Sequence, residues 1–465
     1  MAGIGFELNK LIRRRGIVSC VSFYGVAAVV YTGPMLLGFC MLYMISFMAS
    51  LFHVPPSEKE LVIVVISYSL IASNILNSLL SLVTTRYTAD MIYTDRMDKI
   101  LPSMYGSIGI QLLLGIPTYG VFVFFSGAGL VLGIMAFALF CELTVVWTLV
   151  TYITAVKDYK RILMIFAFGT ILSVLAGFVM ITLKIYIVYA MIGAVYIGYG
   201  VILAGAYNVV RQYFPNRMDG CFQFLSRLKD YPTLLFIGIL SSIGLFSHMI
   251  FVWYSIYGKT VLGLFRSSPQ YDIPALFAFV SMLMTTVNFS ATAEVNFYPA
   301  YKDYFDLLSG NGTIRQINTA EDKMIITLER ELVYLAMKQF VFTMIAIALG
   351  GIGFHRFGLV DFNKTETEIF YTLCVAYGFY AVANSITMFL LYFSDYRDAL
   401  IANLLFASVT VIGVILTREN LTYLGYGFVV GAAAMFLASA LLLWKYLSKI
   451  RYHVMLKSVT SNSLE

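Results

Sequence analysis

Charge is scarce in this sequence. Only 12% of its 465 residues are Asp, Glu, Lys or Arg, whereas about a quarter of the residues in an ordinary soluble domain are charged. Hydrophobic residues make up 60% of the chain. No polar stretch is long enough to form a nucleotide-binding or glycosyltransferase domain, and a net charge of +6 without a basic soluble domain does not indicate nucleic-acid binding. The composition is that of a protein embedded in a membrane.

Groups that carry catalytic chemistry are equally few. The five cysteines are scattered and form no Cys-x-x-Cys pair, which argues against a disulfide framework and a zinc site. Gly258-Lys259-Thr260 is not a P-loop, because Trp253 stands where the first glycine belongs. Asp90, Asp95 and Asp98 are the best candidates for holding magnesium, but Arg86 and Arg96 beside them favour an ion-paired loop. We therefore expect no enzyme activity, no metal and no cofactor.

Long apolar runs dominate what is present. A membrane-spanning helix needs about 20 mostly apolar residues. The sequence contains twelve such runs, at 19–51, 61–85, 103–126, 129–154, 162–183, 185–210, 232–256, 274–297, 336–354, 368–392, 399–417 and 423–444. This pattern predicts an all-α integral membrane protein with twelve transmembrane helices.

The distribution of Lys and Arg predicts the orientation. Most of the 31 basic residues lie in connections on the same side as the N-terminus, which places both termini in the cytoplasm. Residues 1–16 have the pattern of an amphipathic helix lying on the cytoplasmic membrane surface, and 445–465 form a cytoplasmic tail. The long first span contains Gly33 and Pro34, and the bend expected there is either a hinge or a passive kink.

The two halves of the chain resemble each other. Spans 61–85 and 274–297 are the richest in hydroxyl and amide side chains, and each runs into an acidic, tyrosine-bearing segment. Six spans per half predict parallel repeats around a central cavity. We therefore expect two pseudo-symmetric six-helix lobes, 17–210 and 232–444, joined by a cytoplasmic linker at 211–231.

Polar residues inside a bilayer are costly, so they face the bundle or a wet cavity. The candidates for a cavity or substrate path are Glu142, Asn74, Asn77, Asn288, Glu294 and His248. For Glu142 the alternatives are a carboxyl group that joins two helices and a site for a proton, a cation or a sugar amine. Glu294 can equally be an interfacial acid, His248 a hydrogen-bonded structural histidine, and the three asparagines interhelical contacts.

The longest cytoplasmic connection, 298–335, is the best candidate for partner docking. Thr319 and Asp322 resemble a capping box at the start of a helix that continues into the ninth span. That helix carries Glu329, Arg330 and Glu331, which we assign to partner docking. A solvated connector remains the alternative.

Several strings resemble one family along almost the whole chain. They are the opening Met-Ala-Gly-Ile-Gly-Phe-Glu-Leu, Thr85-Arg-Tyr-Thr-Ala-Asp90, Ile273-Pro-Ala-Leu, Glu294-Val-Asn-Phe-Tyr298, Tyr396-Arg-Asp-Ala and Ile450-Arg-Tyr-His453. Together they resemble the PelG family, the inner-membrane export component of the Pel exopolysaccharide machinery. In that family the seventh span often carries a charged pair before its tryptophan, whereas here Leu245–Trp253 has His248 in its place.

The resemblance implies a fold like that of the multidrug, oligosaccharidyl-lipid and polysaccharide flippases. It also implies export of a cationic, partly deacetylated hexosamine polymer across the cytoplasmic membrane. The partners it implies are a cytosolic glycosyltransferase and membrane subunits that sense cyclic di-GMP. Three alternatives stay open: a flippase for lipid-linked oligosaccharide, a cation-coupled antiporter, and a membrane scaffold that does not transport.

Overall fold

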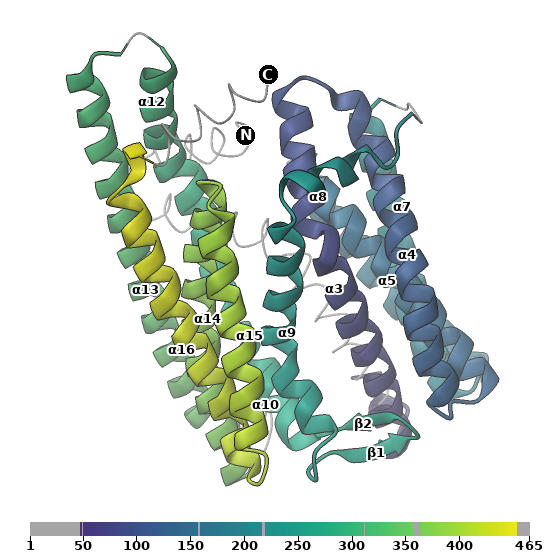
Figure 1. The fold of residues 1–465 in the computed structure, drawn as a ribbon. Coiled ribbons are helices and arrows are strands. Elements are labelled where there is room, and N and C mark those ends of the chain that lie inside the picture. The colour runs from purple at the N-terminus through teal and green to yellow at the C-terminus, as the bar shows by residue number, and fades with distance from the viewer. Residues whose placement is uncertain are drawn as a thin grey trace. The chain divides into compact units, whose positions relative to one another are not determined.

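The structure is a computed structural model that describes residues 47–48, 50–156, 159–215, 219–310, 312–356 and 362–452. Within these ranges the chain is almost entirely helical, apart from one two-stranded hairpin (Figure 1). It divides into two compact units, one ending at Asp272 and one beginning at Ile273. We call these the N-terminal unit and the C-terminal unit and describe each by itself.

Eleven stretches of the described ranges are long and apolar enough to cross a membrane, and they match predicted spans two to twelve. Ten of them are single helices: α3 (Pro56–Tyr93), α4 (Ile100–Phe125), α5 (Leu130–Val156), α6 (Tyr159–Thr182), α7 (Ile187–Tyr213), α9 (Thr233–Trp253), α13 (Ile314–Arg356), α14 (Lys364–Tyr392), α15 (Tyr396–Leu416) and α16 (Leu421–Leu447). The N-terminal amphipathic helix and the Gly33–Pro34 hinge, with most of the first span, lie outside the described residues. The chain is a multi-pass membrane protein.

Helix α3 is central to the N-terminal unit, where it packs against α4, α5, α7 and α9. The α3–α9 contact is unusually close. A Cβ atom on Gly238 of α9 would lie only 2.0 Å from the backbone oxygen of Ser78. Small residues allow such backbone approach between membrane helices. Helix α9 therefore belongs to the N-terminal unit, and Figure 1 shows it beside α3.

The division between the two compact units falls between Asp272 and Ile273, inside helix α10 (Pro269–Val280). The packing of α9 on α3 keeps α9 with the N-terminal unit. Compact units need not coincide with sequence repeats, so the linker at 211–231 stays a prediction. The repeat relation between 17–210 and 232–444 stays a prediction.

A hairpin that the sequence analysis did not assign closes one end of the N-terminal unit. Strand β1 (Lys259–Leu262) pairs antiparallel with β2 (Phe265–Ser267), and Gly263 turns between them with φ +54°. Glu60 of α3 accepts a hydrogen bond from Ser267 Oγ at 2.8 Å and pairs with Lys259 Nζ at 2.9 Å. The hairpin is thereby fastened to the start of α3.

Predicted span 274–297 is not one straight helix in the structure. It consists of α10, a break at residues 281–282, α11 (Leu283–Ala291) and a π-helical turn, η3 (Thr292–Phe297). Such π-helical turns interrupt the regular hydrogen-bond ladder and occur often at functional sites. The interruption lies in the polar part of the span, next to α13.

The predicted helix that enters the ninth span is confirmed, but its predicted cap is wrong. Helix α13 runs without interruption from Ile314 to Arg356. The Thr319 hydroxyl donates to the Arg315 carbonyl one turn back, so it lies inside the helix. The capping contacts are made earlier, where Gln316 N donates to Thr313 Oγ1 and Thr313 N donates to Gln316 Oε1. Thr-x-x-Gln satisfies the capping-box pattern as well as Thr-x-x-Glu does.

Helix α12 (Tyr298–Ser309) packs back along α13, so 298–335 is a helical hairpin and not a loop. Tyr304 of α12 is fully buried, together with Ala320, Met324 and Leu328 of α13. Burial raises the pKa of Tyr304, which keeps its hydroxyl neutral. Arg451, just beyond α16, bonds to Glu321 and ties the end of that helix to α13. Helices α14, α15 and α16 complete the C-terminal unit.

Candidate functional site

Glu142 lies on α5 inside the N-terminal unit, and its side chain faces α7. Its side chain is 9% exposed, and its Oε1 is 3.0 Å from where a Cβ on Gly200 of α7 would lie. Its Oε2 is buried and has no hydrogen-bond partner among the described residues. An ionised carboxylate left unpaired in a bundle interior costs several kcal/mol. The position can therefore hold a protonated acid or take up a cation.

The polar face predicted for α3 packs against its neighbours in the same unit. Gln111 of α4, a residue that the sequence analysis missed, donates to Asn77 Oδ1 at 3.5 Å and accepts from Thr148 of α5 at 3.1 Å. It is almost fully buried and so joins three helices. Asn74 lies half-buried one turn before Asn77 on α3. The sequence feature that could have identified Gln111 is its amide side chain inside a predicted span, because such amides form hydrogen bonds between membrane helices.

His248 is fully buried in α9, and its Nδ1 lies 2.9 Å from the Tyr271 hydroxyl. Nearby on the chain, Trp253 Nε1 donates to Asp272 Oδ1 at 2.8 Å. These bonds fasten the end of α9 to the start of α10. This geometry agrees with the structural alternative for His248 and gives it no exposed surface for a substrate.

A second buried polar cluster lies in the C-terminal unit, between α11 and α13. Asn288 of α11 is 2% exposed, and its Oδ1 is 3.5 Å from Lys338 Nζ. Gln339, the neighbour of Lys338, bonds to Thr285, to Thr343 at 3.0 Å and to the Ser281 carbonyl at 3.4 Å. The cluster thus continues across the break that ends α10. Sequence reasoning found Asn288 but missed both α13 residues.

Glu331 is buried next to η3 and pairs with its exposed neighbour Arg330 at 3.5 Å. It is 7% exposed, and its carboxylate accepts from Thr292 of η3 at 3.5 Å, while Glu329 and Arg330 are exposed. Successive helix residues point about 100° apart, so three in a row cannot share one face. The grouping of all three as docking residues therefore does not fit the structure. Glu294 lies in η3, and its side chain is outside the described part.

The candidate residues are divided between the two units. Glu142 and the Asn77–Gln111 bonds lie in the N-terminal unit, and Asn288 and Glu331 lie in the C-terminal unit. Among the described residues, no three His, Cys, Asp or Glu side chains come together as metal ligands would. Both sites suit binding and release of a polar or charged group inside a membrane helix bundle.

Comparison with known proteins decides the family. Residues 1–455 match the family described as "PelG: Putative exopolysaccharide Exporter (EPS-E)". The chain belongs to the PelG family. No curated protein matches it.

Solved structures similar to this PelG-family chain are transporters. One is a MOP-superfamily transporter from Pyrococcus furiosus, with 15% identity, a TM-score of 0.59, and coverage of 91% of this chain and 96% of that chain. Another is an outward-facing multidrug-resistance MATE transporter, with 16% identity, a TM-score of 0.56 and coverage of 92% and 96%. A third is the MATE transporter ClbM in complex with Rb⁺, with 11% identity, a TM-score of 0.57 and coverage of 90% and 94%.

At these identities the likeness shows the fold alone. It confirms the predicted class: the chain has the all-α membrane fold of MATE and MOP transporters, which is built from twelve helices in two lobes. The PelG family match, together with this fold, makes the chain a membrane transporter.

Proposed function

We propose that this chain exports a Pel-type hexosamine polysaccharide across the cytoplasmic membrane, with both of its termini in the cytoplasm, as a transporter without enzyme activity. The observation that carries the proposal is the PelG family match over residues 1–455 on a MATE-like and MOP-like fold. The buried polar sites of the two units support it, because a transporter must bind a polar cargo or a coupling ion within the bilayer.

The decisive experiment is polymer efflux from proteoliposomes that contain this chain, with the purified glycosyltransferase and its sugar nucleotide on one side only. We expect labelled polymer in the opposite compartment and none from liposomes that lack the chain. Synthesis without translocation would support a scaffold and overturn the proposal. Movement of lipid-linked oligosaccharide in place of free polymer would favour the flippase alternative.

Glu142 supports a role for a cation in this transport. A carboxyl group that has an unpaired oxygen and is buried beside Gly200 can exchange a proton or bind a cation. The Rb⁺ complex of the neighbour ClbM shows a cation bound to a protein of this fold. We expect Glu142→Gln to reduce export several-fold without reducing the amount of folded protein. Thr154→Val, an exposed position on the same helix, is the control, and equal export by both variants would leave Glu142 as an interhelical contact.

We further propose that the α12–α13 hairpin docks the cytosolic glycosyltransferase, and that subunits sensing cyclic di-GMP join the same assembly. The hairpin is folded and can present a surface, because Tyr304 of α12 and Met324 and Leu328 of α13 are buried. Its exposed charges suit a polar interface. Reversal of Glu329 alone is the sharper test, because Arg330 pairs with buried Glu331 at 3.5 Å and a change at either of those two residues would also disturb folding.

The expected result is weaker co-purification of the glycosyltransferase with Glu329→Arg, and unchanged co-purification with Lys364→Glu, which changes the first residue of α14. Crosslinks from the glycosyltransferase that map only to 211–231 would show that the docking site lies elsewhere.

A further inference from the structure

The connection between α7 and α9 is a folded element and not a passive linker. Within its described residues, 214–215 and 219–232, it contains a short 3-10 turn, η2 (Gln223–Leu225), and one helical turn, α8 (Ser226–Asp230). Gly220 enters it with φ +81°, a backbone conformation that favours glycine. We call Gly220–Asp230 the strap.

Apolar contacts press the strap onto α3 and α4. Phe224 is fully buried, and its ring lies edge-on to Tyr87 of α3, with 6.5 Å between centroids. Gly106 of α4 makes this possible. A Cβ there would be 2.0 Å from the Cys221 backbone oxygen and 3.1 Å from the Phe224 ring. The strap therefore covers this end of the helix bundle, with Phe224 inserted into it.

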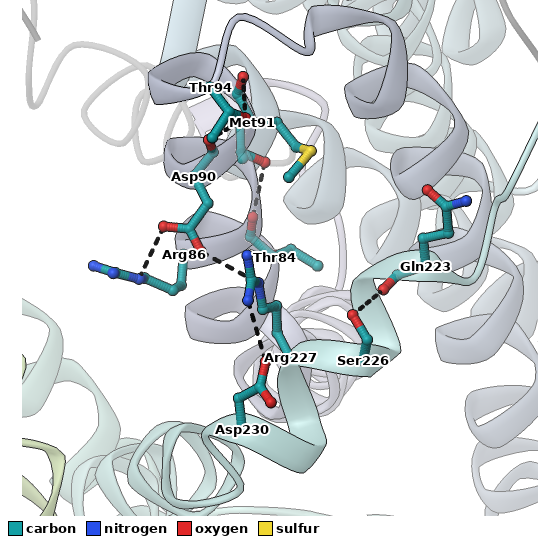
Figure 2. A network of polar contacts seen from close by, with 10 residues as sticks. Thr84, Arg86, Asp90, Met91, Thr94, Gln223, Ser226, Arg227 and Asp230 are labelled. Atoms are coloured by element: carbon teal, nitrogen blue, oxygen red, sulfur yellow. Dashed lines mark hydrogen bonds and ion pairs between the residues drawn. The ribbon is translucent and has the colours of Figure 1, made fainter. Parts of the chain in front are cut away.

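Charges fasten the strap along one edge. Figure 2 shows a chain of alternating charge from α3 to α8. Arg86 Nε lies 3.2 Å from one Asp90 oxygen, and Arg227 Nε lies 3.3 Å from the other. Arg227 also reaches Asp230 at 3.1 Å. In the same place the Arg86 guanidinium lies 5.9 Å from the centre of the Tyr231 ring. Arg86, Tyr87 and Asp90 all come from the string that resembles the family.

The arrangement of these pairs allows the strap to detach without stranding a charge. Arg86–Asp90 is an i,i+4 pair within α3, and Arg227–Asp230 is an i,i+3 pair within α8. Of these three ion pairs, Arg227–Asp90 is the one that joins α3 to α8. If that bridge breaks, each charge keeps its local partner and remains close to solvent, so no unpaired ion is buried.

We propose that the strap is a reversible latch on the N-terminal unit, closed in this structure and opened during each export cycle by rupture of the Arg227–Asp90 bridge and withdrawal of Phe224. The cyclic opening rests on the proposed transport function, whereas the latch itself does not. Because the strap joins α7 to α9, its opening frees the start of α9 from the ends of α3 and α4.

Hydrogen exchange of the full chain in nanodiscs tests the latch without transport. Asp90→Asn, Arg227→Gln and Gly106→Ala should each speed amide exchange in 221–231 at least tenfold. The matched controls are Asp95→Asn, at an exposed acid beyond the end of α3, and Gly109→Ala, one turn along α4 where a Cβ meets nothing within 4 Å. The double variant Asp90→Asn/Arg227→Gln should exchange no faster than the singles. Unchanged protection in all three folded variants, or equal loss in the controls, overturns the proposal.

Crosslinking tests the opening. In a chain whose five native cysteines are replaced, Asp90→Cys and Arg227→Cys are joined by a short, reducible bis-thiosulfonate reagent. Export should stop on crosslinking and return on reduction, while each single-cysteine variant keeps exporting after the same treatment. Full export by the crosslinked protein refutes cyclic opening. If the untreated wild type exports nothing, the proposed function has failed, and the exchange experiment still decides the latch.

Discussion

The contact between α9 and α3 gives the most direct test of the N-terminal unit. Gly238→Ala places a methyl group 2.0 Å from the Ser78 backbone oxygen, which cannot rotate away as a flexible side chain would. An ordinary contact begins at 3.4 Å, so the helices have to separate by about 1.4 Å locally. Forcing extra volume into a close-packed interface costs about 1–3 kcal/mol. Against this, alanine gains about 0.5–1 kcal/mol over glycine inside a helix.

Gly109→Ala separates these two effects. On α4 it gives the same gain in helix stability from replacing glycine by alanine, but it makes no steric clash, because nothing lies within 4 Å of its Cβ position. The difference between the two variants then reports the α3–α9 contact alone, and we expect Gly238→Ala to be less stable than Gly109→Ala by about 1–3 kcal/mol.

The assay is unfolding of the purified protein in mixed micelles by increasing denaturing detergent. Tryptophan fluorescence follows it well, because Trp253 at the end of α9 stacks on Tyr68 of α3 with 4.6 Å between ring centroids. The emission of Trp253 should change as α9 leaves α3, and a Trp253→Phe variant identifies its share of the signal. Equal stability of the two alanine variants would show that α9 does not approach α3 as described, and would also remove the basis for placing α9 in the N-terminal unit.

Three further predictions concern single contacts. Gln339→Leu leaves Thr285 and Thr343 without their shared partner and should lower the free energy of unfolding by about 1–3 kcal/mol, more than Thr343→Val does in the same assay. Thr313→Ala removes the capping contacts of α13, so it should lower the free energy of unfolding by about 1 kcal/mol and speed amide exchange at the start of that helix. Thr319→Val should do neither, because Thr319 lies inside the helix. A larger effect of Thr319→Val than of Thr313→Ala would support the cap predicted from the sequence. Glu60→Gln should loosen the β1–β2 hairpin by only about 0–1 kcal/mol, because Lys259 is largely exposed, and 1 M salt should mimic it in the wild type; a change that salt does not reproduce would contradict an electrostatic origin.

The membrane helices of this protein could be predicted from the sequence because the thickness of the bilayer sets the minimum length of a spanning helix. A segment that crosses it must be apolar for about 20 residues and must satisfy its own backbone hydrogen bonds, so eleven described spans match predicted apolar runs. The continuation of the 298–335 connection into α13 could also be predicted, since it depends only on an unbroken helical pattern in neighbouring residues. The resemblance to PelG, carried by short strings, was confirmed by the family match.

Only the tertiary structure showed which helices pack together and which side chains become buried between them. Hydropathy gave no sign that α9 packs on α3, because a glycine that admits a backbone looks like any other apolar residue in a span. The sequence also could not separate buried Glu331 from exposed Glu329, since their burial depends on which side of α13 faces α11 and η3. Gln111 and Gln339 were missed for the same reason. The role of a polar side chain in a membrane helix depends on the residue with which it forms a hydrogen bond, and that residue comes from a distant part of the chain.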